Sequence, residues 1–160
     1  MKDGYSIELI KASWEDAELL FNWVNEEDVR KNSINGRPIG WENHLKWFKT
    51  KIGSDNTFFL IGCLNKVPIG QVRFDLVNDE YFIDYSIDSS LRGSGFGTQI
   101  LSEGIEMLKN ILAKSFIIKA YVNSENAASV KVFKKLHFQE IGLKSENGLL
   151  FKVFKSKIER

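Results

Sequence analysis

Seven short segments of the chain carry the alternating apolar and polar residues, or the short apolar runs, that predict β-strands. Turn residues separate several of them, including Asn65-Lys66 and Asn78-Asp79. The pattern therefore predicts strands over residues 5–10, 57–64, 69–76, 81–87, 116–122, 138–143 and 149–154.

Apolar residues recur at helical spacing in four other segments, 14–24, 41–48, 100–112 and 126–136. Ser13 followed by Asp16 predicts the cap of the first helix. Residues 32–40 hold Asn, Gly and Pro and are expected to form a loop. The order of elements predicts an α+β (mixed α/β) protein in which helices pack on a mixed sheet.

Length and composition narrow the class of protein. The chain has 160 residues and a formal net charge of +1, which suit one domain over 1–160 and give no reason to expect nucleic-acid binding. Cys63, in the apolar run 58–64, is expected to be a core residue. Residues 1–4 precede no apolar signal region, and no apolar run approaches the ~20 residues of a membrane helix. We therefore expect a cytoplasmic protein that makes no membrane contact.

A glycine-rich turn, Arg92-Gly93-Ser94-Gly95-Phe96-Gly97-Thr98, joins a predicted strand to a long predicted helix. Alternating glycines allow close approach of the backbone to a ligand, and the free N–H groups of a helix start favour phosphate. The spacing does not match the G-x-G-x-x-G dinucleotide fingerprint or a Gly-Lys-Ser/Thr loop. The turn therefore predicts a phosphate ligand of another kind.

The residues Arg92, Gly95 and Gly97 form R-x-x-G-x-G, and the segment from Asn126 to Phe138 follows later in the chain. Together these resemble the motifs of the GNAT superfamily of acyl-CoA-dependent N-acyltransferases. The resemblance implies a mostly antiparallel sheet of about seven strands, splayed between the fourth and fifth, with about four helices and acetyl-CoA as cosubstrate. It implies that acetyl-CoA contacts Ser86, Ile87, Arg92, Gly93, Ser94, Gly95, Phe96, Gly97, Thr98, Asn126, Ser129 and Phe133.

The resemblance also implies that the amine attacks the thioester directly, with a backbone N–H near Ile87 polarising the carbonyl. An ammonium acceptor must first lose a proton, and Asp84 is the first candidate for the base, ahead of Asp75 and Glu80. A solvated or salt-bridged strand residue is the alternative interpretation of Asp84. No spacing of metal ligands is present, since the histidines are His44 and His137 alone.

One position departs from the family pattern. Phe133 stands where the family often has a tyrosine whose hydroxyl protonates the departing thiolate. A phenyl ring has no proton to donate. Ser129 or a water molecule is therefore expected to take that role, unless the thiolate leaves without a dedicated acid. His137 occupies a position where the family usually has glycine and is expected to be a tolerated residue at a helix end.

The acceptor is expected to lie against the first two helices, their loop and the central strands. Gln71, Arg73 and Asp75 share one face of a predicted strand, which indicates either a polar cleft or a solvated sheet face. The candidate acceptor-binding residues are Asn32, Ser33, His44, Gln71, Arg73 and Asp75. A monomer or a homodimer is expected.

These acceptor segments resemble bacterial acetyltransferases that modify amino groups on nucleotide-linked sugars for surface polysaccharides. In such a complex a cation from Arg30, Lys31, Arg37 or Arg73 would meet the diphosphate. Acetylation of ribosomal-protein N-termini is the alternative, for which Glu26, Glu27, Asp28 and Glu42 could meet a basic tail. A domain that binds acyl-CoA without turnover is a third possibility.

Overall fold

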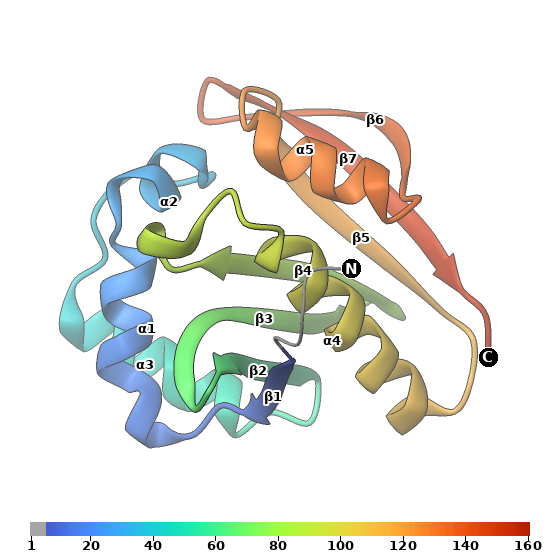
Figure 1. Cartoon of the computed structure of the whole chain (residues 1–160). Coiled ribbons are helices and arrows are strands. Elements are labelled where there is room, and N and C mark those ends of the chain that lie inside the picture. Colours follow the sequence, from blue (N-terminus) through green and yellow to red (C-terminus); the bar gives the residue numbers. More distant parts are fainter. Residues whose placement is uncertain (1–5) are drawn as a thin grey trace.

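A computed structural model describes residues 6–160, and its elements follow the predicted order with one helix added (Figure 1). The predicted α+β class is confirmed. Tyr5, the expected start of the first strand, and residues 1–4 lie outside the described residues. The strands are β1 (Ile7–Lys11), β2 (Thr57–Leu64), β3 (Val67–Val77), β4 (Glu80–Ile87), β5 (Phe116–Asn123), β6 (Gln139–Glu146) and β7 (Leu149–Ile158). The helices are α1 (Ala17–Val24), α2 (Glu27–Asn32), α3 (Trp41–Ile52), α4 (Phe96–Leu112) and α5 (Ala127–Lys135).

The seven strands form one sheet in the order β1-β2-β3-β4-β5-β7-β6. Every neighbouring pair is antiparallel except β4 and β5, which run parallel and pair at two positions only, Tyr81 with Ile118 and Phe82 with Lys119. Beyond Phe82 the two strands separate, and Figure 1 shows β5 leaning away from β4. The expected splay between the fourth and fifth strands is therefore confirmed.

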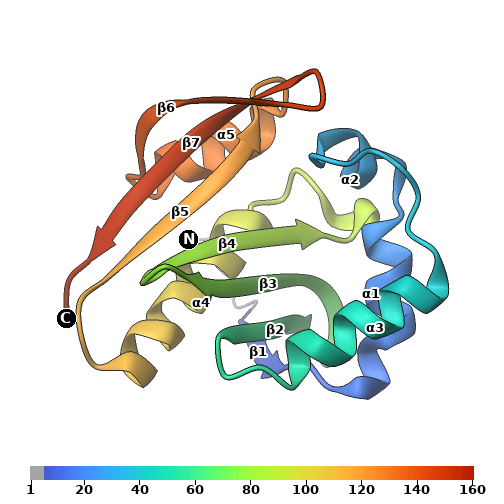
Figure 2. The ribbon, with the colours of Figure 1, turned by 180° about the vertical axis from the view of Figure 1, so that it is seen from behind.

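Helices cover both faces of the sheet, so alternate side chains of the strand β2 point into two different cores. Leu60 faces the main core, which α4 and α5 cover, whereas Phe59, Ile61 and Cys63 face a second core with α1 and α3. Figures 1 and 2 show these helix pairs on opposite faces of the sheet. Cys63 is buried there, as predicted. None of the helices between residues 6 and 160 is long and apolar enough to cross a membrane.

The helical region before residue 41 differs from the sequence prediction. The first predicted helix begins as a 3₁₀ turn, Trp14–Asp16, whose start is capped as expected: the Ser13 N–H donates to the Asp16 carboxylate over 2.8 Å. The short helix α2 was not predicted. Its six residues include one apolar side chain, Val29, and none is buried. A polar helix of this length carries no apolar periodicity that could reveal it.

The helix α5 ends in a Schellman motif. The Phe138 N–H donates to the Phe133 carbonyl and the His137 N–H donates to the Lys134 carbonyl, each over 3.0 Å. The Phe133 and Phe138 rings pack edge to face, 5.1 Å apart, which is the apolar contact that accompanies this motif. His137 must then adopt a left-handed backbone, with φ of 63°. This geometry favours glycine at the position, so histidine is accommodated there at some cost in stability.

Replacing His137 by glycine is expected to raise the free energy of unfolding by about 0.5–1 kcal/mol, because glycine adopts positive φ without a Cβ clash. The exposed imidazole makes no hydrogen bond within the described residues that the change would remove. Urea denaturation of both proteins measures the difference. A His137→Gly protein less stable than the parent would contradict this account of the helix end.

Candidate active site

The glycine-rich turn presents the start of α4 to an open cleft. Gly95 is the residue that precedes the helix, with φ of 86°, and Gly93 has φ of 79°. Both values lie in the left-handed region that favours glycine. The backbone N–H groups of Phe96, Gly97 and Thr98 stand in the first turn, where no carbonyl of the helix can receive them. The turn thus offers N–H donors and the positive end of a helix dipole to an anion.

The cleft has a volume of about 750 Å³ and lies where β4 and β5 separate. The structure brings most of the predicted donor-site residues to its walls, although they come from the three elements β4, α4 and α5 and from two loops. Ser94 does not line the cleft. The predicted residues that do are Asn32, Ser33, Asp84, Ser86, Ile87, Arg92, Gly93, Gly95, Phe96, Gly97, Thr98, Asn126, Ser129 and Phe133.

Arg92 lines this cleft, but its guanidinium is bound to other parts of the protein. It pairs with Glu26 over 2.5 Å and with Asp28 over 3.3 Å, and its Nε donates to the Ile87 carbonyl over 3.1 Å. The side chain therefore holds the start of α2 against the end of β4. Because Arg92 is engaged by these partners, the backbone N–H groups of the glycine turn are the groups left to bind an anion.

A second, smaller cavity of about 250 Å³ lies between β3, β4 and the helices α1, α2 and α3. Its walls are mostly apolar, with Leu20, Trp23 and Trp47 among them. Asp84, Tyr85 and Ser86 of β4 line both this pocket and the larger cleft. The two cavities therefore meet along these three residues of one strand and also share Val29 and Ser33.

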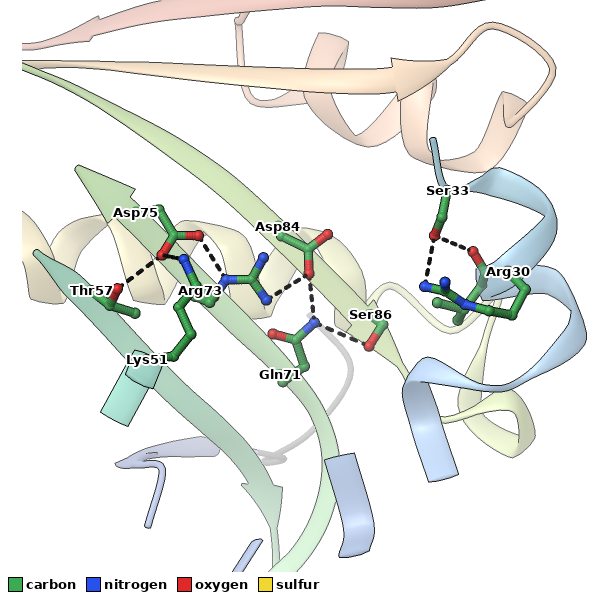
Figure 3. Close-up of polar contacts among 10 residues, drawn as sticks. Arg30, Ser33, Lys51, Thr57, Gln71, Arg73, Asp75, Asp84 and Ser86 are labelled. Carbon is green, nitrogen blue, oxygen red and sulfur yellow. Dashed lines mark hydrogen bonds and ion pairs between the residues drawn. The ribbon is translucent and has the colours of Figure 1, made fainter. Parts of the chain in front are cut away.

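A chain of polar contacts forms the floor of the smaller pocket (Figure 3). The Gln71 amide nitrogen donates to the Asp84 carboxylate over 3.1 Å and to the Ser86 hydroxyl over 3.3 Å. Arg73 lies 3.7 Å from the same carboxylate, and its guanidinium stacks over the Trp47 ring at 4.9 Å. The Asp84 side chain is 57% exposed, so its carboxylate stays open to a ligand. The expectation that Gln71 and Arg73 share a polar face of the sheet is confirmed.

Asp75 shares this strand face but lies outside both cavities. Its carboxylate accepts hydrogen bonds from Lys51 and Arg73, each over 2.8 Å, and from Thr57 over 2.9 Å. Burial alone would raise the pKa of Asp75, but the charges and hydrogen bonds of Arg73 and Lys51 outweigh it and lower that pKa. Asp75 thus holds Arg73 in place beside Asp84, as Figure 3 shows.

His44 lines the smaller pocket but is packed as a core residue. Its side chain is 1% exposed, its Nε2 is 2.8 Å from the Ala17 carbonyl oxygen, and the rings of Trp41 and Phe48 stack on it. Burial lowers the pKa of His44. The neutral ring therefore ties α3 to α1 and supports the pocket wall.

A pair of hydroxyl groups that the sequence did not reveal lies in the larger cleft. The Tyr85 hydroxyl donates to the Ser129 hydroxyl over 3.0 Å. Ser129 belongs to α5, whose first N–H groups are capped by Asn126. Phe133 is buried among Tyr85, Phe138 and Phe154. Alternation along β4 predicts that Tyr85 points away from Asp84, but nothing in the sequence shows its contact with a residue 44 positions later.

The arrangement can hold a phosphate-bearing ligand in the cleft and an amine in the pocket, with a carboxylate where they meet. Residues 6–160 contain no group of three or more His, Cys, Asp or Glu side chains placed to bind a metal ion. The groups at the junction are those suited to acyl transfer by direct attack: a candidate base and hydroxyl donors.

Comparison with known proteins identifies the family. Residues 6–139 match the family described as "Acetyltransferase (GNAT) domain". The acetyltransferase PseH of Campylobacter jejuni is 25% identical over 126 residues, which are 78% of this chain and 77% of that protein. A domain from Methanocaldococcus jannaschii has a TM-score of 0.82 at 25% identity, over 97% of this chain and 100% of that one. The protein yncA of Salmonella typhimurium, solved with its cofactor acetyl-CoA, has a TM-score of 0.79 at 18% identity, over 97% of this chain and 95% of that one. The chain therefore belongs to the GNAT family and is an acyl-CoA-dependent acetyltransferase.

Proposed function

We propose that this single-domain protein transfers the acetyl group of acetyl-CoA to the amino group of a nucleotide-linked deoxyamino sugar in the cytoplasm. The observation that carries the proposal is the junction of the two cavities at Asp84, Tyr85 and Ser86. A donor in the cleft and an acceptor in the pocket would meet there. The amine would then lie beside the Asp84 carboxylate and the thioester beside the end of β4.

The donor part of the proposal rests on the start of α4. The pyrophosphate would take the N–H groups between Gly93 and Thr98, and the pantetheine arm would run along the open side of β4 toward Ser86 and Ile87. Strand geometry supports this placement, because alternate backbone groups of β4 point toward the gap and have no partner strand beyond Phe82.

The acceptor part rests on one unmet polar atom of the smaller pocket, the Gln71 Oε1. Gln71 is 7% exposed, and its Oε1 has no hydrogen-bond partner in residues 6–160. A buried acceptor atom without a partner is costly, so the pocket favours a ligand that brings an N–H or O–H donor. A sugar offers several such donors, and a site that pairs with them discriminates strongly against ligands that lack them. The apolar walls of the pocket would contact the deoxy carbon or the methyl group of the sugar.

The charged residues near the pocket support a nucleotide sugar over a ribosomal tail. Glu26 and Asp28, two of the acids that a basic tail would need, both pair with Arg92, which offsets one of their two negative charges. Among the basic candidates, Arg30 donates to the Val24, Asn35 and Arg37 carbonyls, so its role is to hold the loop after α2. Lys31 lines the large cleft and makes no ion pair within the described residues. We therefore assign Lys31 to the diphosphate; Arg37, the other basic candidate in this loop, lines neither cavity.

A competition assay tests the acceptor. The protein and acetyl-CoA are incubated with equal concentrations of a UDP-linked 4-amino-4,6-dideoxy sugar and a peptide with a free N-terminal alanine. We expect the sugar to be acetylated about 10- to 100-fold faster, since leaving the buried Gln71 Oε1 without a donor costs about 1–3 kcal/mol. Mass spectrometry of both products measures the ratio. Preferential acetylation of the peptide would contradict the proposed sugar acceptor without contradicting the assignment as an acetyltransferase.

A further inference from the structure

One hydrogen bond spans the donor cleft from wall to wall. The Tyr85 hydroxyl, from β4, reaches the Ser129 hydroxyl of α5 over 3.0 Å. The two strands that border the cleft have already separated at this point, because their last paired position is Phe82 with Lys119. Tyr85 and Ser129 both line the cleft, and the Tyr85 ring also packs against the main core.

Packing fixes the phenol in this position. The Tyr85 ring meets Phe133 edge to face at 5.9 Å, and it lies under the first turn of α4. A Cβ built on Gly97 would approach the Tyr85 Cε2 to 3.2 Å, so glycine makes the room that the ring occupies. Residues of α4 and α5 confine the ring, and the hydrogen bond to Ser129 places its hydroxyl in the larger cleft.

Acetyl transfer to an amine releases a thiolate, which ends as a thiol only after it takes up a proton. Phe133, buried beside the Tyr85 ring, offers none. We propose that the Tyr85 hydroxyl, oriented by Ser129, donates the proton to the departing sulfur of CoA. The inference rests on the proposed donor cleft and adds a catalytic residue to it.

The step balances as follows. The amine nitrogen forms a bond to the acetyl carbon, and the C–S bond breaks with its electron pair on sulfur. Sulfur takes the proton of the Tyr85 hydroxyl, and the Ser129 hydroxyl turns to donate to the phenolate that remains. The attacking ammonium has lost one proton to Asp84 or to solvent and loses a second as the amide forms. One of these protons restores the phenol.

The surroundings of Tyr85 keep it protonated at neutral pH. Burial raises the pKa of Tyr85, the hydrogen bond to Ser129 opposes that rise, and the negative charge of Asp84 on the same strand adds to it. From α4 and α5 the ring is met by uncharged residues, Gly97, Ser129 and Phe133. A general acid must be protonated to act, so turnover should fall as pH rises through the pKa of Tyr85.

Tyr85→Phe keeps the ring and removes only the hydroxyl. With the UDP-linked 4-amino-4,6-dideoxy sugar as probe, we expect kcat to fall about 10- to 100-fold, with the KM for acetyl-CoA within about twofold of the parent. The alkaline fall in kcat should disappear. Ser129→Ala should lower kcat less and move the alkaline fall to higher pH, because its hydrogen bond lowers the pKa of Tyr85. Tyr81→Phe is the matched control: Tyr81 is on the same strand, packs on Phe116 and lines neither cavity.

A second measurement needs no acceptor. Ultraviolet absorbance follows the ionisation of the CoA thiol bound to each protein, with the protein alone as blank. Cys63 does not interfere, because it is buried and its pKa is raised. A hydrogen bond from Tyr85 to the thiolate should give bound CoA a thiol pKa about one unit lower in the parent than in Tyr85→Phe. Equal thiol pKa values and an unchanged kcat in Tyr85→Phe would overturn the inference. Failure of the parent to bind CoA would instead overturn the proposed donor cleft.

Discussion

Gly95→Val is expected to weaken the binding of CoA by about 100-fold or more. Valine would need the positive φ of Gly95, which a β-branched residue adopts only under strain, and its side chain would project where the pyrophosphate meets the N–H groups of α4. Hydrogen bonds to a charged group are worth about 1.5–3 kcal/mol each, so misplacing two of them accounts for the loss.

Isothermal titration calorimetry with CoA measures the effect, and circular dichroism shows whether the protein stays folded. A Cβ at Gly142 would meet no neighbour within 4 Å, and that residue lies on the edge strand β6, so Gly142→Val serves as the matched control and should bind CoA normally. Gly95→Ala provides a variant with less strain. A folded Gly95→Val protein with the affinity of the parent would place the donor elsewhere.

Asp84→Asn should lower kcat by about 100-fold or more, because the amide keeps the shape of the side chain but cannot accept a proton from the amine. The KM for acetyl-CoA should hardly change. The deficit should shrink as pH rises, since the acceptor then loses its proton to solvent before it binds. Gln71 and Arg73, which now contact the carboxylate, can both donate to the amide oxygen, so the pocket floor should keep its structure.

Steady-state kinetics with the UDP-linked amino sugar, between neutral and alkaline pH, measure this profile. Asp79→Asn is the control, because Asp79 is an exposed carboxylate in the turn that leads into the same strand and asparagine tolerates its positive φ. An Asp84→Asn protein with a raised KM for the sugar and an unchanged kcat would make Asp84 a residue that binds the acceptor. The proton would then leave by another route.

The strands could be predicted from the sequence because burial on two faces imposes alternation. The range 57–64 agrees with β2 at both ends, and the predictions for β4, β5 and β7 each agree at one end. The remaining strand ends within the described residues differ by one to four residues. The largest difference is at β7, which continues to Ile158 through Lys155 and Lys157. Those lysines interrupt the apolar pattern, but pairing with β5 continues to the end of the strand. Tertiary pairing, which the local sequence does not record, extends the strand there.

The candidate site was predictable where a motif is local and not where it depends on distant contacts. The glycines at 93 and 95 fulfil a backbone need that their own sequence shows. Arg92 was expected to face a phosphate, but its partners Glu26 and Asp28 lie more than 60 residues earlier. The polar face of β3 was visible from alternation, whereas the role of Asp75 in holding Arg73 required the fold to bring Lys51 and Thr57 beside it.

The separation of β4 from β5 also bears on how this molecule avoids aggregation. A sheet that splits in its interior has two additional free edges, and exposed strand edges are templates for pairing with other chains. Here both inner edges are recessed in a cleft that α2, the glycine turn and α5 border, so a flat strand of another molecule cannot approach them. The thin, flexible pantetheine arm of the proposed donor, which carries amide groups, can enter the cleft and pair with the free edge of β4. The fold thus keeps an unpaired edge for recognition without the self-association that such an edge invites on an open sheet.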